Sequence, residues 1–202
     1  MHQITVQHAA LAIVQRKELA ELVGFESRNK YAIETTDGQP LWFAAEQGKG
    51  LLSTVFRQLL GHWRTFEIHV FDTARQLVLR AIHPFTLFFQ RLEVYSADGR
   101  PLGRLQQRFS ILSKRFDVQD ARGATVLSVR SPLWKPWTFS FQRDGRELAV
   151  VKKQWGGAVR ELLTDADRFR VDFLAPELGP DERALLVCAG IFIDLQYFEK
   201  QA

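Results

Sequence analysis

The segment that decides the fold is PDERALLVCAGIFIDLQYF, residues 180–198. A proline followed by two acidic residues is typical of a helix start, so we predict a helix over about residues 181–198. The uncharged run 184–193 is apolar on every face, and such a helix must be buried in protein or in lipid. Its ten residues fall short of the about 20 that cross a bilayer, and Asp194 and Gln196 interrupt it. We therefore favour burial within the protein over a single-pass membrane span.

Upstream of this helix, the chain repeats one pattern: an alternating apolar run, a turn with Asp or Gly, and a returning apolar run. Alternation with period two marks half-buried strands. The Asp-Gly pairs supply the positive φ angles that tight hairpin turns require. The pattern covers residues 31–43, 66–79, 92–103, 116–127 and 139–150, and a last unit begins at 169–173.

Six units of two strands predict a mainly β protein with about twelve strands, over about residues 10–178. A flat sheet of that width would expose its edges, so we predict a closed antiparallel barrel. The C-terminal helix would fill its interior, because a barrel this wide needs filling. A length of 202 residues suits a single domain over 1–202. The central-helix residues are then Leu185, Leu186, Cys188, Ile191, Phe192 and Ile193.

Charge is unevenly distributed along the chain. Residues 57–160 hold 18 Lys/Arg and 8 Asp/Glu, a net of +10, and the remainder holds 9 and 15, a net of −6, which together give +4. A basic middle suggests an anionic partner, whereas a solvated surface of mixed charge is the plainer alternative. A single cysteine suits a reducing compartment, and the N-terminus has no secretory signal pattern, so we expect a cytoplasmic protein.

Motifs of several enzyme classes are missing from the sequence. There is no Walker A run, no G-x-S-x-G elbow and no zinc-type Cys/His set, and the five histidines have no metal-ligand spacing. Asp194, the charge inside the apolar helix, is expected to be structural and hydrogen-bonded. We therefore predict a binding or lipid-handling protein and not an enzyme.

Several spaced motifs resemble the phospholipid scramblase family, in the same order. They run from about Leu11 to Glu199, and the absence of cysteine-rich loops resembles the bacterial members. The resemblance implies a Tubby-like barrel around a hydrophobic helix and a lipid-associated function. The motifs are LVGFESRNKY (22–31), FAAE (43–46), KQWGG (153–157), TDADRF (164–169) and CAGIFID (188–194), with Phe198-Glu199 at the end.

The resemblance also implies a twelve-residue calcium segment beginning at Asp165, with acids at its first, third and last positions. Asp165 and Asp167 match the first two, but the last falls on Pro176. Arg168 and Arg170 would oppose a divalent cation. These departures disfavour calcium, and the alternative is a polar turn in which either aspartate caps backbone amides.

Apolar segments stand where other family members have cysteine-rich, acylated loops. Residues 51–64 have the pattern of an amphipathic helix, and 84–89 and 134–137 are aromatic segments between strands. We hypothesise direct insertion at the membrane interface, since Trp beside Lys or Arg suits a headgroup region. The alternative is that these segments cap the barrel ends. The candidate contact residues are Leu52, Phe56, Leu59, Trp63, Phe85, Phe88, Phe89, Trp134 and Trp137.

Three functions are compatible with these features. The first is a scramblase-family protein that binds an anionic phospholipid membrane peripherally and promotes lipid movement between leaflets. The second is a Tubby-like module that binds phosphoinositide or nucleic acid through the basic middle, with steep salt dependence. The third is a scaffold without a ligand. The sequence leaves lipid preference and oligomeric state open.

Overall fold

A computed structural model describes residues 8–16, 29–47, 65–154 and 167–198, and within them the chain forms twelve strands and one helix. The helix α5 spans Pro180–Tyr197. The strands are β1 (Ala10–Gln15), β2 (Lys30–Thr35), β3 (Pro40–Glu46), β4 (Phe66–Asp72), β5 (Leu77–His83), β6 (Arg91–Ser96), β7 (Pro101–Gln107), β8 (Ser113–Asp120), β9 (Thr125–Pro132), β10 (Thr138–Arg143), β11 (Arg146–Gln154) and β12 (Arg168–Phe173).

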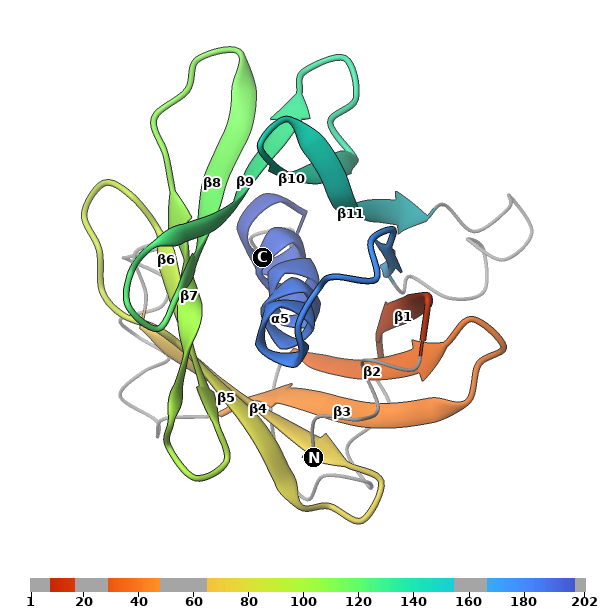
Figure 1. Ribbon diagram of the computed structural model, residues 1–202. Helices are drawn as coiled ribbons and strands as arrows, with labels where there is room; N and C mark the ends of the chain where they lie inside the picture. Colours follow the sequence, from red (N-terminus) through yellow and green to blue (C-terminus); the bar gives the residue numbers. More distant parts are fainter. Residues whose placement is uncertain (1–7, 17–28, 48–64, 155–166, 199–202) are drawn as a thin grey trace.

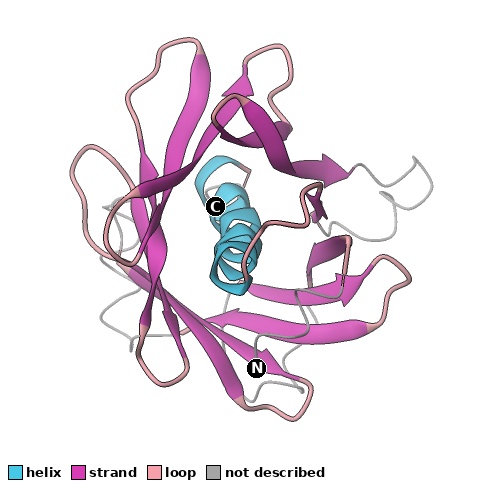
Figure 2. Ribbon diagram, viewed as in Figure 1, coloured by secondary structure: helices cyan, strands magenta, loops and turns pink. Residues whose placement is uncertain are grey.

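The strands form a closed antiparallel barrel in which each strand pairs with its neighbours in sequence, and β1 pairs with β12 to close the circle. Figure 1 shows α5 running through the middle of this barrel, and Figure 2 shows the single cyan helix surrounded by strands. The barrel around a helix that the sequence predicted is therefore confirmed. One detail differs: the last unit has no second strand of its own, and β1 from the other end of the chain supplies its partner.

Alternating burial explains why these segments form strands. In β4 and β6 every second residue is buried, as expected for a sheet with one face on the core. The turn between β10 and β11 shows the local signal clearly, because Asp144 (φ 51°) and Gly145 (φ 79°) both adopt the positive φ of a tight hairpin turn.

The six predicted central-helix residues are all buried, with exposures of 0–1%. Their contacts form one continuous core with the inward side chains of the strands. Burial raises the pKa of the Cys188 thiol to about 12, so this cysteine is an inert core residue. The interior is therefore packed and apolar, not a channel.

The start of the helix is tied to the barrel by polar contacts. The backbone N–H of Gly179 donates to Glu182 Oε2 at 2.9 Å, which caps the first turn. Arg183 donates to the backbone oxygens of Leu178 and His8, and its guanidinium lies 4.5 Å from the centre of the Phe173 ring. The entry of α5 into the barrel is thereby fixed.

Candidate functional site

The two ends of the barrel differ in character. Because successive strands are antiparallel, the loops 84–90, 108–112 and 133–137 all lie at one end, which we call the loop end. Short turns such as 97–100 and 144–145 lie at the other, the turn end. The helix follows β12, so it begins at the turn end and its C-terminus reaches the loop end.

Large apolar side chains at the loop end are exposed to solvent. Phe88 is 83% exposed, Ile111 79% and Trp134 79%, one from each loop. The other large apolar side chains at this end are 44–74% exposed. Among the described residues, the set at this end is Phe85, Leu87, Phe88, Phe89, Phe109, Ile111, Leu112, Leu133, Trp134 and Trp137.

The five predicted contact residues that the structure describes, Phe85, Phe88, Phe89, Trp134 and Trp137, all belong to this exposed set. Their exposed fractions run from 44% for Trp137 to 83% for Phe88, which favours the membrane-contact hypothesis, and membrane contact by these residues stays a prediction. The other four, Leu52, Phe56, Leu59 and Trp63, lie outside the described residues, as does the predicted amphipathic helix over 51–64.

The loop 108–112 was missed from the sequence, although it carries Phe109, Ile111 and Leu112. Its pattern, apolar residues between Arg108 and Lys114, is the same mixture that marked the other two loops. The loop is too short to show an amphipathic periodicity in the sequence. Its position at the loop end follows only from the pairing of β7 and β8, which it connects.

Hydrogen bonds connect two of these loops, 84–90 and 133–137, within themselves or to neighbouring strands. In 84–90, Thr86 Oγ1 donates to Gln90 Oε1 at 3.0 Å, and the Gln90 N–H donates to Gln107 Oε1 at 2.9 Å. In 133–137, Ser131 Oγ donates to the Lys135 carbonyl at 3.1 Å, and the Lys135 N–H donates to the Pro132 carbonyl at 2.9 Å. The polar groups named here therefore have hydrogen-bond partners in the protein, while the large apolar side chains of the same loops are exposed to solvent.

The three described loop segments are positively charged in sequence, although Arg108 Nε lies 2.6 Å from Asp117 Oδ2 of β8. Segments 84–90, 108–115 and 133–137 contain Arg108, Lys114, Arg115 and Lys135 and no Asp or Glu, a net of +4. Exposed aromatic residues beside cations, without acids, fit the interface of an anionic bilayer.

Beneath the loops, two lysines cover the end of the helix. Lys114 Nζ lies 4.6 Å from the ring centres of both Tyr197 and Phe198, and Lys153 Nζ lies 4.6 Å from the Phe198 ring. Burial, with the nearby Lys153 charge, lowers the pKa of Lys114. Burial raises the pKa of Tyr197 to about 12. Cations at this position also complement the negative end of the helix dipole, so the loop end closes over the helix.

Asp194 is fully buried near this end of the helix, and the Tyr31 hydroxyl donates to its Oδ2 at 2.8 Å. This supplies the hydrogen-bonding partner expected for it. A buried carboxylate with such a partner fixes the register of the helix in the barrel.

Of the two aspartates of the predicted calcium segment, the structure describes only Asp167. Asp167 Oδ1 lies 2.7 Å from Lys153 Nζ, whereas Asp165 lies outside the described residues. Across the described ranges, no group of three or more His, Cys, Asp or Glu side chains could hold a metal ion. The expectation that calcium is disfavoured here stays untested.

Comparison with known proteins gives a consistent result. The family model described as Scramblase matches residues 2–200. This chain belongs to the scramblase family. It is 30% identical over 205 residues to phospholipid scramblase 1 of Mus musculus, covering 94% of this chain and 61% of that protein. It is 29% identical to phospholipid scramblase 2 of Bos taurus, covering 94% and 68%.

More distant relatives extend the family beyond mammals. A phospholipid scramblase family protein of Schizosaccharomyces pombe is 25% identical over 213 residues, covering 88% of this chain and 56% of that protein. No solved structure matches this chain significantly. Among the described residues, no helix combines the length and the apolar character that crossing a membrane requires.

Proposed function

We propose that this scramblase-family protein binds phospholipid membranes peripherally through the loop end of its barrel and disturbs the bilayer there, which promotes lipid movement between leaflets. The observation that carries the proposal is the exposed apolar set on three loops, with four cations and no acid in the same segments. The names of the similar mouse and bovine proteins, phospholipid scramblases, support the lipid ligand. The single cysteine suits the cytoplasmic face of the membrane.

Burial of apolar side chains and attraction of cations both favour binding to a bilayer. Burying one large apolar side chain contributes about 1.5–3 kcal/mol, so one residue from each of three loops contributes roughly 5–9 kcal/mol. Arg115 and Lys135 near an anionic surface add about 1 kcal/mol each, whereas Arg108 is paired with Asp117 and Lys114 covers the end of the helix. The sum, roughly 7–11 kcal/mol, is the gross gain from which the costs of association are subtracted.

Bilayer disturbance is the lipid-moving step that suits this fold. The barrel interior is filled by α5 and its core contacts, so headgroups have no path through it. Apolar side chains inserted from the three loops would instead thin and disorder one leaflet beside the protein. The proposal is therefore for a lipid-moving protein and not for an enzyme.

Flotation with vesicles of phosphatidylcholine and an anionic phospholipid tests membrane binding. The variant F88S/I111S/W134S removes one apolar side chain from each loop, and we expect it to bind about a hundredfold more weakly or worse. L174S is the matched control, because Leu174 is also exposed (54%) but follows β12 at the turn end. Equal flotation of both variants and the native protein would refute the proposed surface.

Two further arms separate the alternatives. Single-stranded DNA added as a competitor displaces the protein if the basic surface prefers nucleic acid, and that binding would weaken steeply with salt. Flotation with calcium and with a chelator tests the segment at Asp165 and Asp167, where we expect no difference. Dithionite quenching of labelled lipid in vesicles then measures lipid movement, which we expect F88S/I111S/W134S to lose together with binding.

A further inference from the structure

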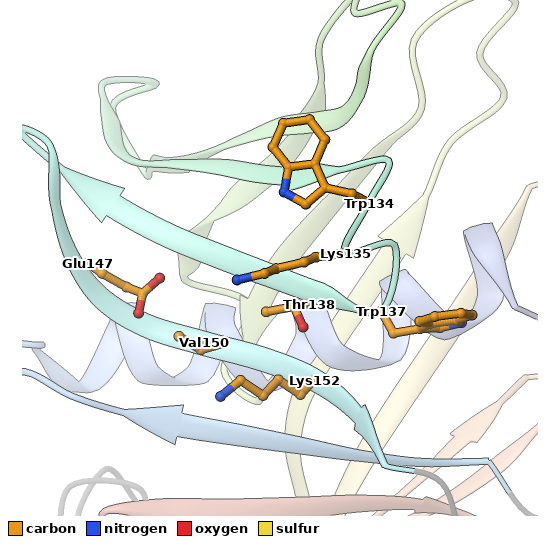
Figure 3. A pocket seen from close by; sticks show the side chains of 7 residues that line it. All are labelled: Trp134, Lys135, Trp137, Thr138, Glu147, Val150 and Lys152. Atoms are coloured by element: carbon orange, nitrogen blue, oxygen red, sulfur yellow. The ribbon is translucent and has the colours of Figure 1, made fainter.

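An open pocket lies beside the loop end, on the outer face of the hairpin formed by β10 and β11 (Figure 3). Its volume of about 490 Å³ falls within the range of small-ligand sites. The lining residues are Trp134, Lys135, Trp137, Thr138, Glu147, Val150 and Lys152.

Strand register orders these side chains along the barrel axis. Thr138 pairs with Lys152 next to the loop end, and Gln142 pairs with Glu147 next to the turn end. Trp134 and Trp137 lie on the loop itself. From the membrane-facing end inward, the pocket therefore presents indole rings, then two ammonium groups, then a carboxylate.

The charged groups converge on the pocket. The amines of Lys135 and Lys152 both extend toward the side of the pocket where the Glu147 carboxylate lies (Figure 3). None of the three belongs to an ion pair with another described residue. The Ser140 hydroxyl donates to Glu147 Oε2, and Gln142 Nε2 donates to Ser140 Oγ at 2.9 Å, so the carboxylate is held in place.

A purely anionic ligand does not fit this arrangement, because Glu147 would repel it. Two ammonium groups and one carboxylate give the pocket a net charge of +1. A headgroup that carries a phosphate, an ammonium and a second anion has a net charge of −1 and complements it group by group. The order also agrees, since in a docked phospholipid the acyl chains, the phosphate and the amine follow one another away from the bilayer centre.

We propose that this pocket binds the headgroup of an amine-bearing phospholipid. The phosphate lies at Lys135, the ammonium at Glu147 and the second anion, where the headgroup has one, at Lys152, and the acyl chains leave past Trp134 and Trp137 into the bilayer. This inference rests on the proposed function, because docking of the loop end brings the pocket to the membrane surface. It adds headgroup selectivity, which insertion of apolar side chains alone would not give.

Soluble headgroups test the pocket without a membrane. The indole N–H signals of Trp134 and Trp137 are followed by NMR while glycerophosphoserine, glycerophosphoethanolamine, glycerophosphoglycerol or inorganic phosphate is added. We expect glycerophosphoserine to bind most tightly, glycerophosphoethanolamine next, and the two compounds without an amine most weakly. Preference of glycerol-linked headgroups over inorganic phosphate distinguishes a lipid site from a phosphate site.

Substitutions test which pocket residues bind the anionic groups of the headgroup and which bind its amine. K135Q/K152Q should weaken glycerophosphoserine binding about tenfold or more. E147Q should abolish the preference for amines while leaving glycerophosphoglycerol binding unchanged or tighter. The matched controls R122Q and D37N alter exposed charges in turns at the turn end and should change neither. Circular dichroism verifies that each variant is folded.

Flotation separates this inference from the proposed function. Vesicles with phosphatidylglycerol as the anionic lipid should bind E147Q at least as well as the native protein, whereas vesicles with phosphatidylserine should favour the native protein. Flotation without any amine preference, or the absence of an indole shift on adding headgroups, would refute headgroup binding in the pocket. Membrane binding through the loop end would remain supported. Loss of flotation on both lipids by F88S/I111S, which leaves every pocket residue in place, with the indole shifts of Trp134 and Trp137 retained, supports both.

Discussion

Gly190 offers a sharp test of how closely the helix fits inside the barrel. A Cβ added at this position would lie 2.4 Å from Ile13 Cδ1 of β1, closer than real Cβ atoms approach, but at ordinary distances from Ile13 Cγ1 (3.7 Å) and Val171 Cγ2 (3.6 Å). Only one atom at the end of one side chain therefore opposes an alanine. Gly190→Ala gains about 1 kcal/mol of helix propensity and pays about 1–3 kcal/mol for overpacking.

Ile13→Val removes the opposing atom and by itself costs about 0.5–1.5 kcal/mol. In that background Gly190→Ala should no longer clash, so it should stabilise the protein by up to about 1 kcal/mol. The two substitutions are therefore coupled by about 1–3 kcal/mol, the size of the overpacking term. Urea unfolding of the native protein, both single variants and the double variant measures this coupling, with fluorescence and circular dichroism compared to verify a two-state transition.

Additivity would refute the reasoning. If Gly190→Ala changes the free energy of unfolding equally in both backgrounds, within about 0.5 kcal/mol, the helix does not pack against β1 at this point. A stabilising effect of Gly190→Ala in the native background would lead to the same conclusion.

Two other predictions follow from the same core. Gly103→Ala should be far more damaging than Gly190→Ala, by roughly 3 kcal/mol or more of unfolding free energy, because its Cβ would lie 2.1 Å from the Gln119 backbone oxygen, which cannot move aside; urea unfolding or soluble yield measures it. Stability should fall between about pH 9 and 12, because burial raises the pKa values of Cys188 and Tyr197 to about 12, so the unfolded chain loses these protons first. C188A/Y197F should flatten that decline in unfolding experiments across this pH range, and an unchanged decline would assign it to other groups.

The architecture was predictable because its signals are local. A helix that is apolar all round must be covered, and the expected bounds of 181–198 differ by one residue at each end from Pro180–Tyr197. Asp-Gly turns and period-two alternation located five hairpins. The pairing of β1 with β12 had no local signal, because β1 is buried at Ala10–Val14 without alternation, and its partner lies about 160 residues away.

The candidate site was only partly predictable, for a related reason. Aromatic residues between strands suggested exposed loops at Phe88 and Trp134, but whether a loop side chain faces solvent depends on the folded path of the loop, which includes hydrogen bonds such as Thr86 to Gln90. The pocket was beyond sequence reasoning, since Glu147 and Lys152 meet Trp134 only through strand register and the path of the β9–β10 loop.

Whether the helix leaves the barrel at a membrane decides between two ways of moving lipid. Withdrawal would expose at least the six central-helix side chains, at about 1.5–3 kcal/mol each, and would carry the buried Asp194 away from Tyr31. A bilayer would compensate the apolar side chains but not the carboxylate, and the uncharged run of ten residues is about half of what a span requires.

We therefore expect the helix to stay in place while the loops insert. Hydrogen exchange followed by mass spectrometry should show the amides of 184–194 equally protected with and without anionic vesicles, whereas 84–90, 108–112 and 133–137 should gain protection. F88S/I111S/W134S serves as the unbound control and should show no gain in the loops. Faster exchange in 184–194 on adding vesicles would mean that the helix is released, and lipid movement would then have to be explained by an opened barrel.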